Sequence, residues 1–195
     1  MKIIGLTGGI GMGKSTAAAA FRRAHIPVFD ADASVHRLQS PGGPAIPVIE
    51  AAFPGTTSNR ALDRAALREA VLGKPDALKR LEGIIHPMVK DDERAFLARA
   101  HRAGASLVVL DVPLLFESWG HRKLDKAVVV SAPRSVQIHR VRLRRRMSAA
   151  DVAAVIARQM PDAEKRRRAD VVIRTGLSRA HTLRSLKRLI RELRP

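Results

Sequence analysis

The stretch GLTGGIGMGKST, residues 5–16, places four glycines and one lysine between residues 8 and 14. An apolar run precedes it, and the alanine-rich run AAAAF follows. Gly8, Gly13, Lys14 and Ser15 satisfy the pattern GxxxxGK[ST], and the flanking runs predict the strand before and the helix after that this pattern requires. The stretch therefore predicts a phosphate-binding P-loop.

The chemistry of such a loop depends on its bare backbone. Glycines let the chain curl so that peptide N–H groups point at phosphate oxygens, and the following helix presents its positive end to the same anion. Lys14 would supply a cation for the β and γ phosphates, and the Ser15 hydroxyl could ligate Mg²⁺. The predicted nucleotide-binding residues are Gly9, Gly11, Met12, Gly13, Lys14, Ser15 and Thr16. The alternative is a glycine-rich turn with an incidental lysine, which the flanking runs disfavour.

Short apolar or β-branched runs at five places read as strands buried on both faces, which is typical of a parallel sheet. They are Lys2 to Thr7, Pro27 to Asp30, Ser106 to Asp111, Ala127 to Ser131 and Asp170 to Ile173. Most of the segments between them have helical spacing. This alternation predicts an α/β fold with a five-stranded parallel sheet and helices on both faces, of the P-loop NTPase type.

Two intervals carry extra helices. Residues 33–104 lack a convincing buried strand and predict a helical insertion with four helices: Ala45 to Phe53, Asp63 to Leu72, Asp76 to Glu82, and a longer one after Pro87. A second helical stretch, residues 133–168, separates the last two strands. We expect one domain over residues 1–195, because this length suits one substantial core.

Composition restricts the class of protein. Hydrophobic residues make up 46% and charged residues 28%, which is typical of a folded globular chain. The absence of cysteine excludes disulfides, thiolate metal sites and a cysteine nucleophile. Neither a signal core nor a stretch of 18 apolar residues is evident, so we expect a soluble cytoplasmic protein without a membrane partner.

The charge of the chain predicts an anionic partner. The formal net charge is +18, and residues 134–195 hold 18 of the 36 Lys and Arg but five of the 18 acidic residues. Such an excess attracts nucleic acid, anionic membranes or phosphorylated small molecules. The charge alone does not choose among them.

Two carboxylates follow the second predicted strand. Asp30 and Asp32 come where a parallel strand delivers side chains to the ligand crevice. There they could hold magnesium or take a proton from an attacking hydroxyl. The alternative reading is that Asp32 caps a helix starting at Ala33 while Asp30 is a solvated strand end.

Several motifs together carry a family resemblance. They are the stretch quoted above, DAD sixteen residues after Lys14, IIHP at 84–87, DVPLLFE at 111–117, RVRLRRRMSAADVAAVIARQM at 140–160 and KRRRADVVI at 165–173. In order and spacing they resemble dephospho-CoA kinases over nearly the whole chain. The combination is more specific than the P-loop alone.

The resemblance implies a nucleotide-kinase-like fold and transfer of the ATP γ-phosphoryl group to the ribose 3′-hydroxyl of dephospho-CoA. It implies a core of about residues 1–32, 105–133 and 169–195, a CoA-binding insertion of about 33–104 and a lid of about 134–168. Asp32 becomes the expected base, Lys14 and Arg140 the other catalytic residues, and Ser15 and Asp32 the magnesium ligands. Asp30 is expected to be structural.

The lid pattern places Arg140 and Arg144 four residues apart, on one helical face. An arginine that closes over the γ-phosphate would neutralise charge in the transition state, and Arg144 would bind the nucleotide. The alternative is a solvated basic helix. Arg145 and Arg146 stand where family members often have an acidic residue, so this lid is more basic than usual. Where many members carry an asparagine near adenine, this chain has Thr175, so Thr175 or backbone groups would contact the base.

Three further residues of these motifs keep open roles. Asp111 ends a strand beside the first and could reach magnesium through water. Glu117 is equally suited to pair with a lid arginine. His86, before Pro87, reads as a helix-start residue or as a substrate contact.

The expected small-molecule partners are ATP and dephospho-CoA, with the protein a monomer or a weak homo-oligomer. The main rival is a nucleic-acid-binding P-loop protein. Aromatic residues are 3%, which leaves few stacking platforms for bases, so no nucleic acid partner is expected. A kinase of another small nucleoside or nucleotide is the second alternative.

Overall fold

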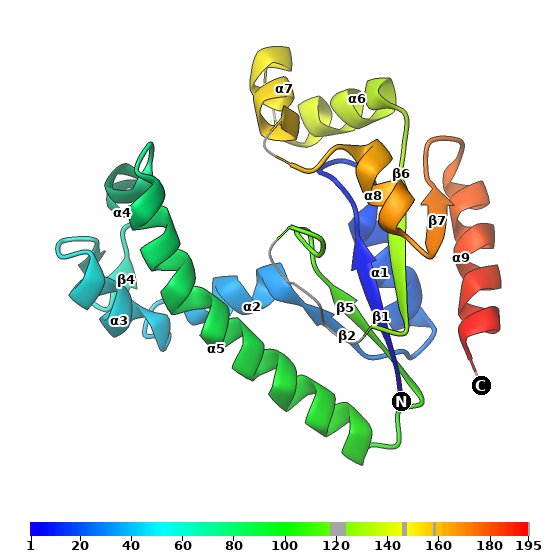
Figure 1. Ribbon diagram of the computed structural model, residues 1–195, viewed down its shortest axis with the longest axis horizontal. Coiled ribbons are helices and arrows are strands. Elements are labelled where there is room, and N and C mark those ends of the chain that lie inside the picture. Colours follow the sequence, from blue (N-terminus) through cyan, green and yellow to red (C-terminus); the bar gives the residue numbers. More distant parts are fainter. Residues whose placement is uncertain (118–123, 146–147, 158, 195) are drawn as a thin grey trace. The chain divides into compact units, whose positions relative to one another are not determined.

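The first strand lies at the centre of a five-stranded sheet with the order β2-β5-β1-β6-β7 (Figure 1). The strands are β1 (Lys2–Thr7), β2 (Val28–Asp30), β5 (Leu107–Asp111), β6 (Lys126–Ser131) and β7 (Val171–Arg174). β1 pairs with β5 and β6 in parallel, and β6 pairs in parallel with β7. The predicted parallel α/β sheet is confirmed.

This computed structural model describes residues 1–117, 124–145, 148–157 and 159–194, apart from the side chains of 144, 145, 149, 150, 154 and 155. The chain divides into two compact units, one of residues 1–29 with 100–195 and one of residues 30–99. No helix within the described ranges is long and apolar enough to span a bilayer.

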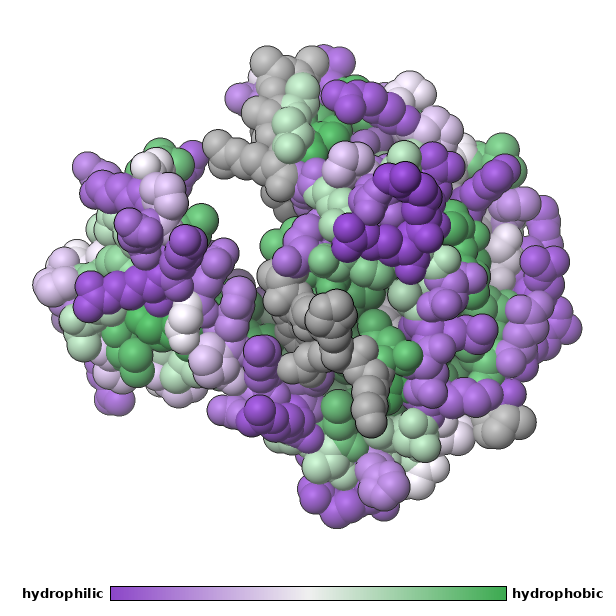
Figure 2. All heavy atoms as spheres, viewed as in Figure 1, coloured by the Kyte–Doolittle hydropathy of each residue, from purple (hydrophilic) through white to green (hydrophobic). Residues whose placement is uncertain are grey.

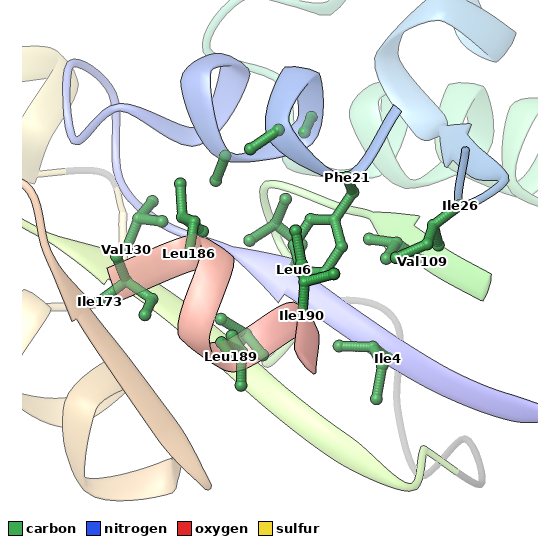
Figure 3. Close-up of a cluster of buried hydrophobic side chains, with 14 of the residues drawn as sticks. Ile4, Leu6, Phe21, Ile26, Val109, Val130, Ile173, Leu186, Leu189 and Ile190 are labelled. Carbon is green, nitrogen blue, oxygen red and sulfur yellow. The ribbon is translucent and has the colours of Figure 1, made fainter. Parts of the chain in front are cut away.

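One face of the sheet is covered by α1 (Lys14–Arg23) and α9 (Arg179–Leu193), which contact each other. Alternate residues of the strands point to this face, and they pack with Phe21 of α1 and with Leu186, Leu189 and Ile190 of α9 (Figure 3). Because the side chains of a strand alternate between faces, every second residue of β1, β5 and β6 contributes to this cluster. The last helix therefore packs one apolar face against the sheet and α1.

The other face meets different elements. A Cβ placed on Gly5 of β1 would lie 2.8 Å from a methyl of Leu115 and 2.7 Å from one of Leu124, so the loop after β5 packs directly on the central strand. Helix α8 (Asp162–Arg168) contacts β6. It follows α6 (Arg134–Arg145) and α7 (Ala149–Ala157), which confirms the second helical stretch. Hydrophilic side chains gather over α8 in Figure 2, where Arg166, Arg167 and Arg168 are exposed.

Residues 30–99 are mainly helical, as predicted. The helices are α2 (Ala31–Leu38), α3 (Ala45–Ala52), α4 (Arg64–Val71) and α5 (Pro75–Arg102). Between α3 and α4, β3 (Thr57–Ser58) and β4 (Ala61–Leu62) form a short antiparallel hairpin, where the sequence predicted no strand. Its turn residues Asn59 and Arg60 both have positive φ, 49° and 60°, which matches the right-handed twist of a two-residue hairpin.

The prediction of two helices on either side of Pro87 is wrong. Helix α5 runs without interruption from Pro75 to Arg102, with Pro87 inside it. A proline removes one backbone hydrogen bond and crowds the preceding turn. In 28 residues the other backbone bonds outweigh that loss, since flanking leucine, alanine, lysine and arginine favour helix. His86 therefore lies in the middle of a helix and not at a helix start.

Hydrogen bonds to Glu50 tie α3 to the segment before the hairpin. Its carboxylate accepts from the Gly55 N–H (2.8 Å) and from the Thr57 hydroxyl (2.8 Å). The bond from Gly55 is the main cause that lowers the pKa of Glu50, and the bond from Thr57 adds to it. The carboxylate therefore contributes stability above its unfolded-state pKa, and the contribution is lost as the pH falls through the folded-state pKa.

The core cluster makes a direct prediction about stability. Leu186 is fully buried, whereas Leu177, just before α9, is 73% exposed. Leu186→Ala should destabilise the protein by about 2–5 kcal/mol because it leaves a cavity against α1 and the sheet. Leu177→Ala should change stability by less than about 0.5 kcal/mol. Urea denaturation of both variants measures the difference, and equal midpoints would contradict this packing.

Candidate functional site

The loop between β1 and α1 has the backbone that its glycines predict. Gly11 and Gly13 have φ of 74° and 94°, values that L side chains rarely adopt. Gly13 is the N-cap of α1 and offers no side-chain cap to the helix. The first turn of α1 contains no acidic residue. The positive end of α1 is thus presented to an anion at this loop.

Loop residues that the sequence predicted as nucleotide-binding take different positions. Met12 is buried: its sulfur accepts from the Ala132 N–H (3.1 Å) and its N–H donates to the Gly9 carbonyl (3.1 Å). Ser15, the second residue of α1, is exposed, and Thr16 is half-buried. The Met12 side chain therefore anchors the loop to the core, while the Ser15 side chain is accessible.

Lys14 is held by Asp111 at the end of the neighbouring strand. Its Nζ lies 2.7 Å from Asp111 Oδ1, and the Asp111 side chain is 3% exposed. Because β5 pairs directly with β1, the carboxyl end of β5 lies beside the start of the loop. The pair fixes a cation and an anion at the place where a nucleotide's terminal phosphates would lie.

The motif at 111–117 connects the sheet to α8. The Pro113 carbonyl accepts from the Thr7 hydroxyl (2.9 Å) and from Lys165 Nζ (3.1 Å). Lys165 is 1% exposed and lies 2.7 Å from Glu117 Oε1, which also accepts from the Met160 N–H (3.1 Å). Glu117 thus pairs with Lys165 of α8, while the side chains of Arg144 and Arg145, together with residues 146 and 158, lie outside the described part of the chain. A buried ammonium is stable here because a carboxylate and a carbonyl surround it.

Arg140 of α6 lies beside the loop, between Gly11 and Thr175. Its guanidinium donates to the Thr175 carbonyl (2.6 Å), to the Thr175 hydroxyl (3.2 Å) and, at 3.5 Å, to the Gly11 carbonyl. The Thr175 hydroxyl in turn donates to the Met12 carbonyl (2.6 Å). These bonds join α6, the end of β7 and the loop.

A cavity of about 160 Å³ lies at this junction. It is lined by Gly11, Gly13, Thr16, Arg140, Thr175, Arg179 and Thr182. Thr175 is buried, and its hydroxyl already donates a hydrogen bond to the Met12 carbonyl. The predicted lid residue Arg144 lies on the same helix, but its side chain is outside the described residues.

The two aspartates after β2 have separate places. Asp30 is the N-cap of α2, where its Oδ1 accepts from the Ala33 N–H at 3.0 Å. Asp32 is exposed in the first turn of the same helix. The alternative reading, with Asp32 as cap and Asp30 as a solvated strand end, is therefore wrong. The helix starts two residues earlier than that reading required, and the cap moves with it.

The donor set suits a magnesium ion that is bound with its nucleotide. Within the described ranges no three His, Asp or Glu side chains group closely enough to hold a metal alone. Magnesium keeps several waters and takes one or two protein oxygens together with substrate phosphates. The accessible Ser15 hydroxyl and the Asp111 carboxylate near Lys14 fit that manner of binding.

Protein families and relatives give a consistent picture. A family model described as dephospho-CoA kinase matches residues 2–179. The dephospho-CoA kinase of Gluconobacter oxydans is 52% identical over 198 residues, covering 100% of this chain and 98% of its own. That of Mesorhizobium japonicum is 52% identical over 194 residues, with the same coverage.

Solved structures agree on the fold. A protein from Thermus thermophilus is 37% identical, with a TM-score of 0.85 over 100% of this chain and 98% of its own. The dephospho-CoA kinase of Campylobacter jejuni, at 21% identity, has a TM-score of 0.66 over 98% of this chain and 97% of its own. The matches over the full length, together with the loop and its lysine, lead to one conclusion: this chain belongs to the dephospho-CoA kinase family.

Proposed function

We propose that this kinase transfers the γ-phosphoryl group of ATP to the ribose 3′-hydroxyl of dephospho-CoA, giving coenzyme A and ADP. The observation that carries the proposal is the loop of residues 8–16, with Lys14 paired to Asp111, in a chain that matches named dephospho-CoA kinases over its full length. The family membership supplies the acceptor, and the loop supplies the donor site.

In this proposal the loop holds the ATP phosphates through its backbone. The proposed phosphate-binding positions are Gly9, Gly11, Met12, Gly13, Lys14, Ser15 and Thr16. The Met12 N–H donates to Gly9 in the described structure, so Met12 would contribute by shaping the loop. Lys14 would turn from Asp111 toward the β and γ phosphates, because a flexible ammonium can exchange one anion for another.

Magnesium would be held by Ser15 and, through water, by the aspartates of the site, with Asp32 the proposed second ligand. When bound, it would neutralise charge on the β and γ phosphates. Ser15 would contribute its hydroxyl oxygen. Asp111 would keep its carboxylate near the metal once Lys14 has moved.

Asp32 is the proposed base. Its carboxylate would take the proton of the 3′-hydroxyl while that oxygen forms a bond to the γ-phosphorus and the bond to the β-bridging oxygen breaks, releasing ADP. Its exposure in the first turn of α2 supports this role, since Asp30 already caps the helix. Residues 33–104 form the proposed CoA-binding insertion.

Arg140 and Arg144 are the proposed arginines of the lid, residues 134–168. Arg140 lines the small cavity beside Gly11, Gly13 and Thr16, a position next to the proposed phosphate site. It would have to release Thr175 to reach the γ-phosphate. Adenine would be contacted by backbone groups near Thr175, since that hydroxyl is occupied.

The direct test is phosphoryl transfer by the purified chain. We expect ADP formation that requires both dephospho-CoA and Mg²⁺, with coenzyme A detected by mass spectrometry. Adenosine is tested as an alternative phosphoryl acceptor. DNA is tested as an alternative activator, because the basic charge could also attract polyanions. ADP formation that depends on either of them and ignores dephospho-CoA would overturn the proposal.

Asp32→Asn should lower kcat by about 10² to 10⁴-fold with little change in ATP affinity, because the base is lost while the phosphate site stays intact. Asp30→Asn is the matched control. Asparagine caps helices about as well as aspartate, so this variant should retain most of its turnover. Steady-state kinetics compare the two. Undiminished turnover of Asp32→Asn would remove Asp32 from the mechanism.

Arg140→Ala should slow phosphoryl transfer by on the order of 10² to 10³-fold, because one fixed charge on the transferring group is lost. Arg142→Ala is the control, since Arg142 is exposed on the same helix. Single-turnover rates at saturating ATP measure the step itself. If only the ATP affinity of Arg140→Ala changes, Arg140 binds the nucleotide without acting on the transfer.

A further inference from the structure

One residue of the P-loop, Ile10, is held by two glutamines, one on its N–H and one on its carbonyl. The Ile10 N–H donates to Gln159 Oε1 at 3.0 Å, and Gln137 Nε2 donates to the Ile10 carbonyl at 2.8 Å. Gln137 lies in α6 and is 4% exposed, while Gln159 is half-buried between α7 and α8. Two segments of the proposed lid region therefore grip the same residue of the loop. We call Gln137 and Gln159 the glutamine clamp.

The chemistry of the clamp is complementary. The backbone of a residue offers one donor and one acceptor, so it needs one acceptor and one donor in return. A glutamine amide can serve either purpose without a charge. Gln159 uses its oxygen and Gln137 its nitrogen. A neutral clamp also adds no fixed charge beside a loop that has to admit phosphates.

Two glycines of the loop lie beside the clamp. A Cβ on Gly9 would lie 3.2 Å from Gln159 Oε1 and 3.3 Å from Gln137 Nε2. A Cβ on Gly11 would lie 2.9 Å from the Gln137 carbonyl and 2.7 Å from a methyl of Val141. A side chain at Gly9 would thus crowd the two clamp amides, and at Gly11 the backbone of α6 and the positive φ exclude one.

The clamp acts on a segment with a special conformation. Ile10 directly precedes Gly11, whose φ is 74°, and the Met12 N–H bonds back across this turn to the Gly9 carbonyl at 3.1 Å. Hydrogen bonds that fix the backbone of Ile10 therefore restrain this turn, and with it the orientation of the amides that come next in the loop. A site that is ordered in advance binds more tightly because less conformational entropy is lost on binding.

We propose that Gln137 and Gln159 are positioning residues that hold the P-loop ready for nucleotide before it arrives. They act through hydrogen bonds to the backbone of Ile10 and touch no reacting atom. The proposal rests on the proposed function only in that ATP and ADP bind at this loop. Loosening the clamp should then weaken nucleotide binding, while turnover at saturating nucleotide is largely kept.

Gln137→Leu and Gln159→Leu remove each hydrogen bond at nearly constant volume. Both glutamines line a cavity of about 690 Å³, so leucine can be accommodated. Each variant should raise the Kd for ADP and the KM for ATP by about 3- to 10-fold, with kcat within about threefold of the unmodified chain. The double variant should fall short of the product of the two effects, because both act on the backbone of one residue, Ile10. Gln39→Leu, in residues 30–99, is the matched control.

Hydrogen exchange of the Ile10 amide gives a direct readout. Exchange should speed up in Gln159→Leu and stay slow in Gln159→Glu, because a carboxylate still accepts from that N–H. Unchanged exchange and unchanged ADP affinity in both leucine variants would overturn the clamp. If the unmodified chain itself bound no ADP, the proposed function would fail instead.

The two glutamate variants decide the matter if a leucine variant does not fold. Gln137→Glu and Gln159→Glu each place one negative charge beside the backbone of Ile10. Position 137 loses its donor, whereas position 159 keeps its acceptor. We expect Gln137→Glu to weaken ADP binding about 3- to 10-fold more than Gln159→Glu. Equal losses would show that charge alone acts, and would overturn the proposal.

Discussion

A loop that is proposed to bind phosphate through its own peptide groups must remain bare and yet keep one shape, and the surrounding unit meets that constraint. Side chains cannot stiffen the loop from within, because glycine is needed where φ is positive, as at Gly11 and Gly13. Order therefore has to come from outside. β1 fixes the start of the loop at the centre of the sheet, α1 fixes its end, and Met12 is buried in the core between them.

The charges around the loop follow the same division between fixed and movable groups. Lys165 is buried, and it pairs with the partly exposed Glu117 and with the Pro113 carbonyl, which joins α8 to the loop after β5. In the pair of Lys14 and Asp111 the carboxylate is the buried partner, and the lysine side chain is 18% exposed. A desolvated ammonium costs much to separate from its partner, whereas a partly solvated one exchanges partners more readily. Of the two lysines, Lys14 is thus the one whose ammonium is accessible to an incoming anion.

Local sequence predicted much of the fold. Continuous apolar runs identified the strands of the sheet, and the spacing of Gly8, Gly13 and Lys14 identified the loop, because both patterns depend on neighbours along the chain. The uninterrupted helix through Pro87 and the hairpin at Asn59 and Arg60 were missed. In these places the outcome depends on a balance between a local penalty and the surrounding structure, which propensity alone does not weigh.

The sequence predicted those residues of the candidate site that belong to a local motif, but not the contacts between residues that are distant along the chain. Lys14 and Ser15 follow from the motif, but the partner of Glu117 and the grip of Gln137 and Gln159 on Ile10 join residues more than forty positions apart. The DAD segment shows the limit most clearly. Two identical side chains two residues apart were assigned in the wrong order by the capping alternative, since a two-residue shift in the helix start exchanges a cap for a first-turn position. The structure makes Asp30 the cap, and it leaves Asp32 exposed in the first turn of α2, where our proposal makes it the base.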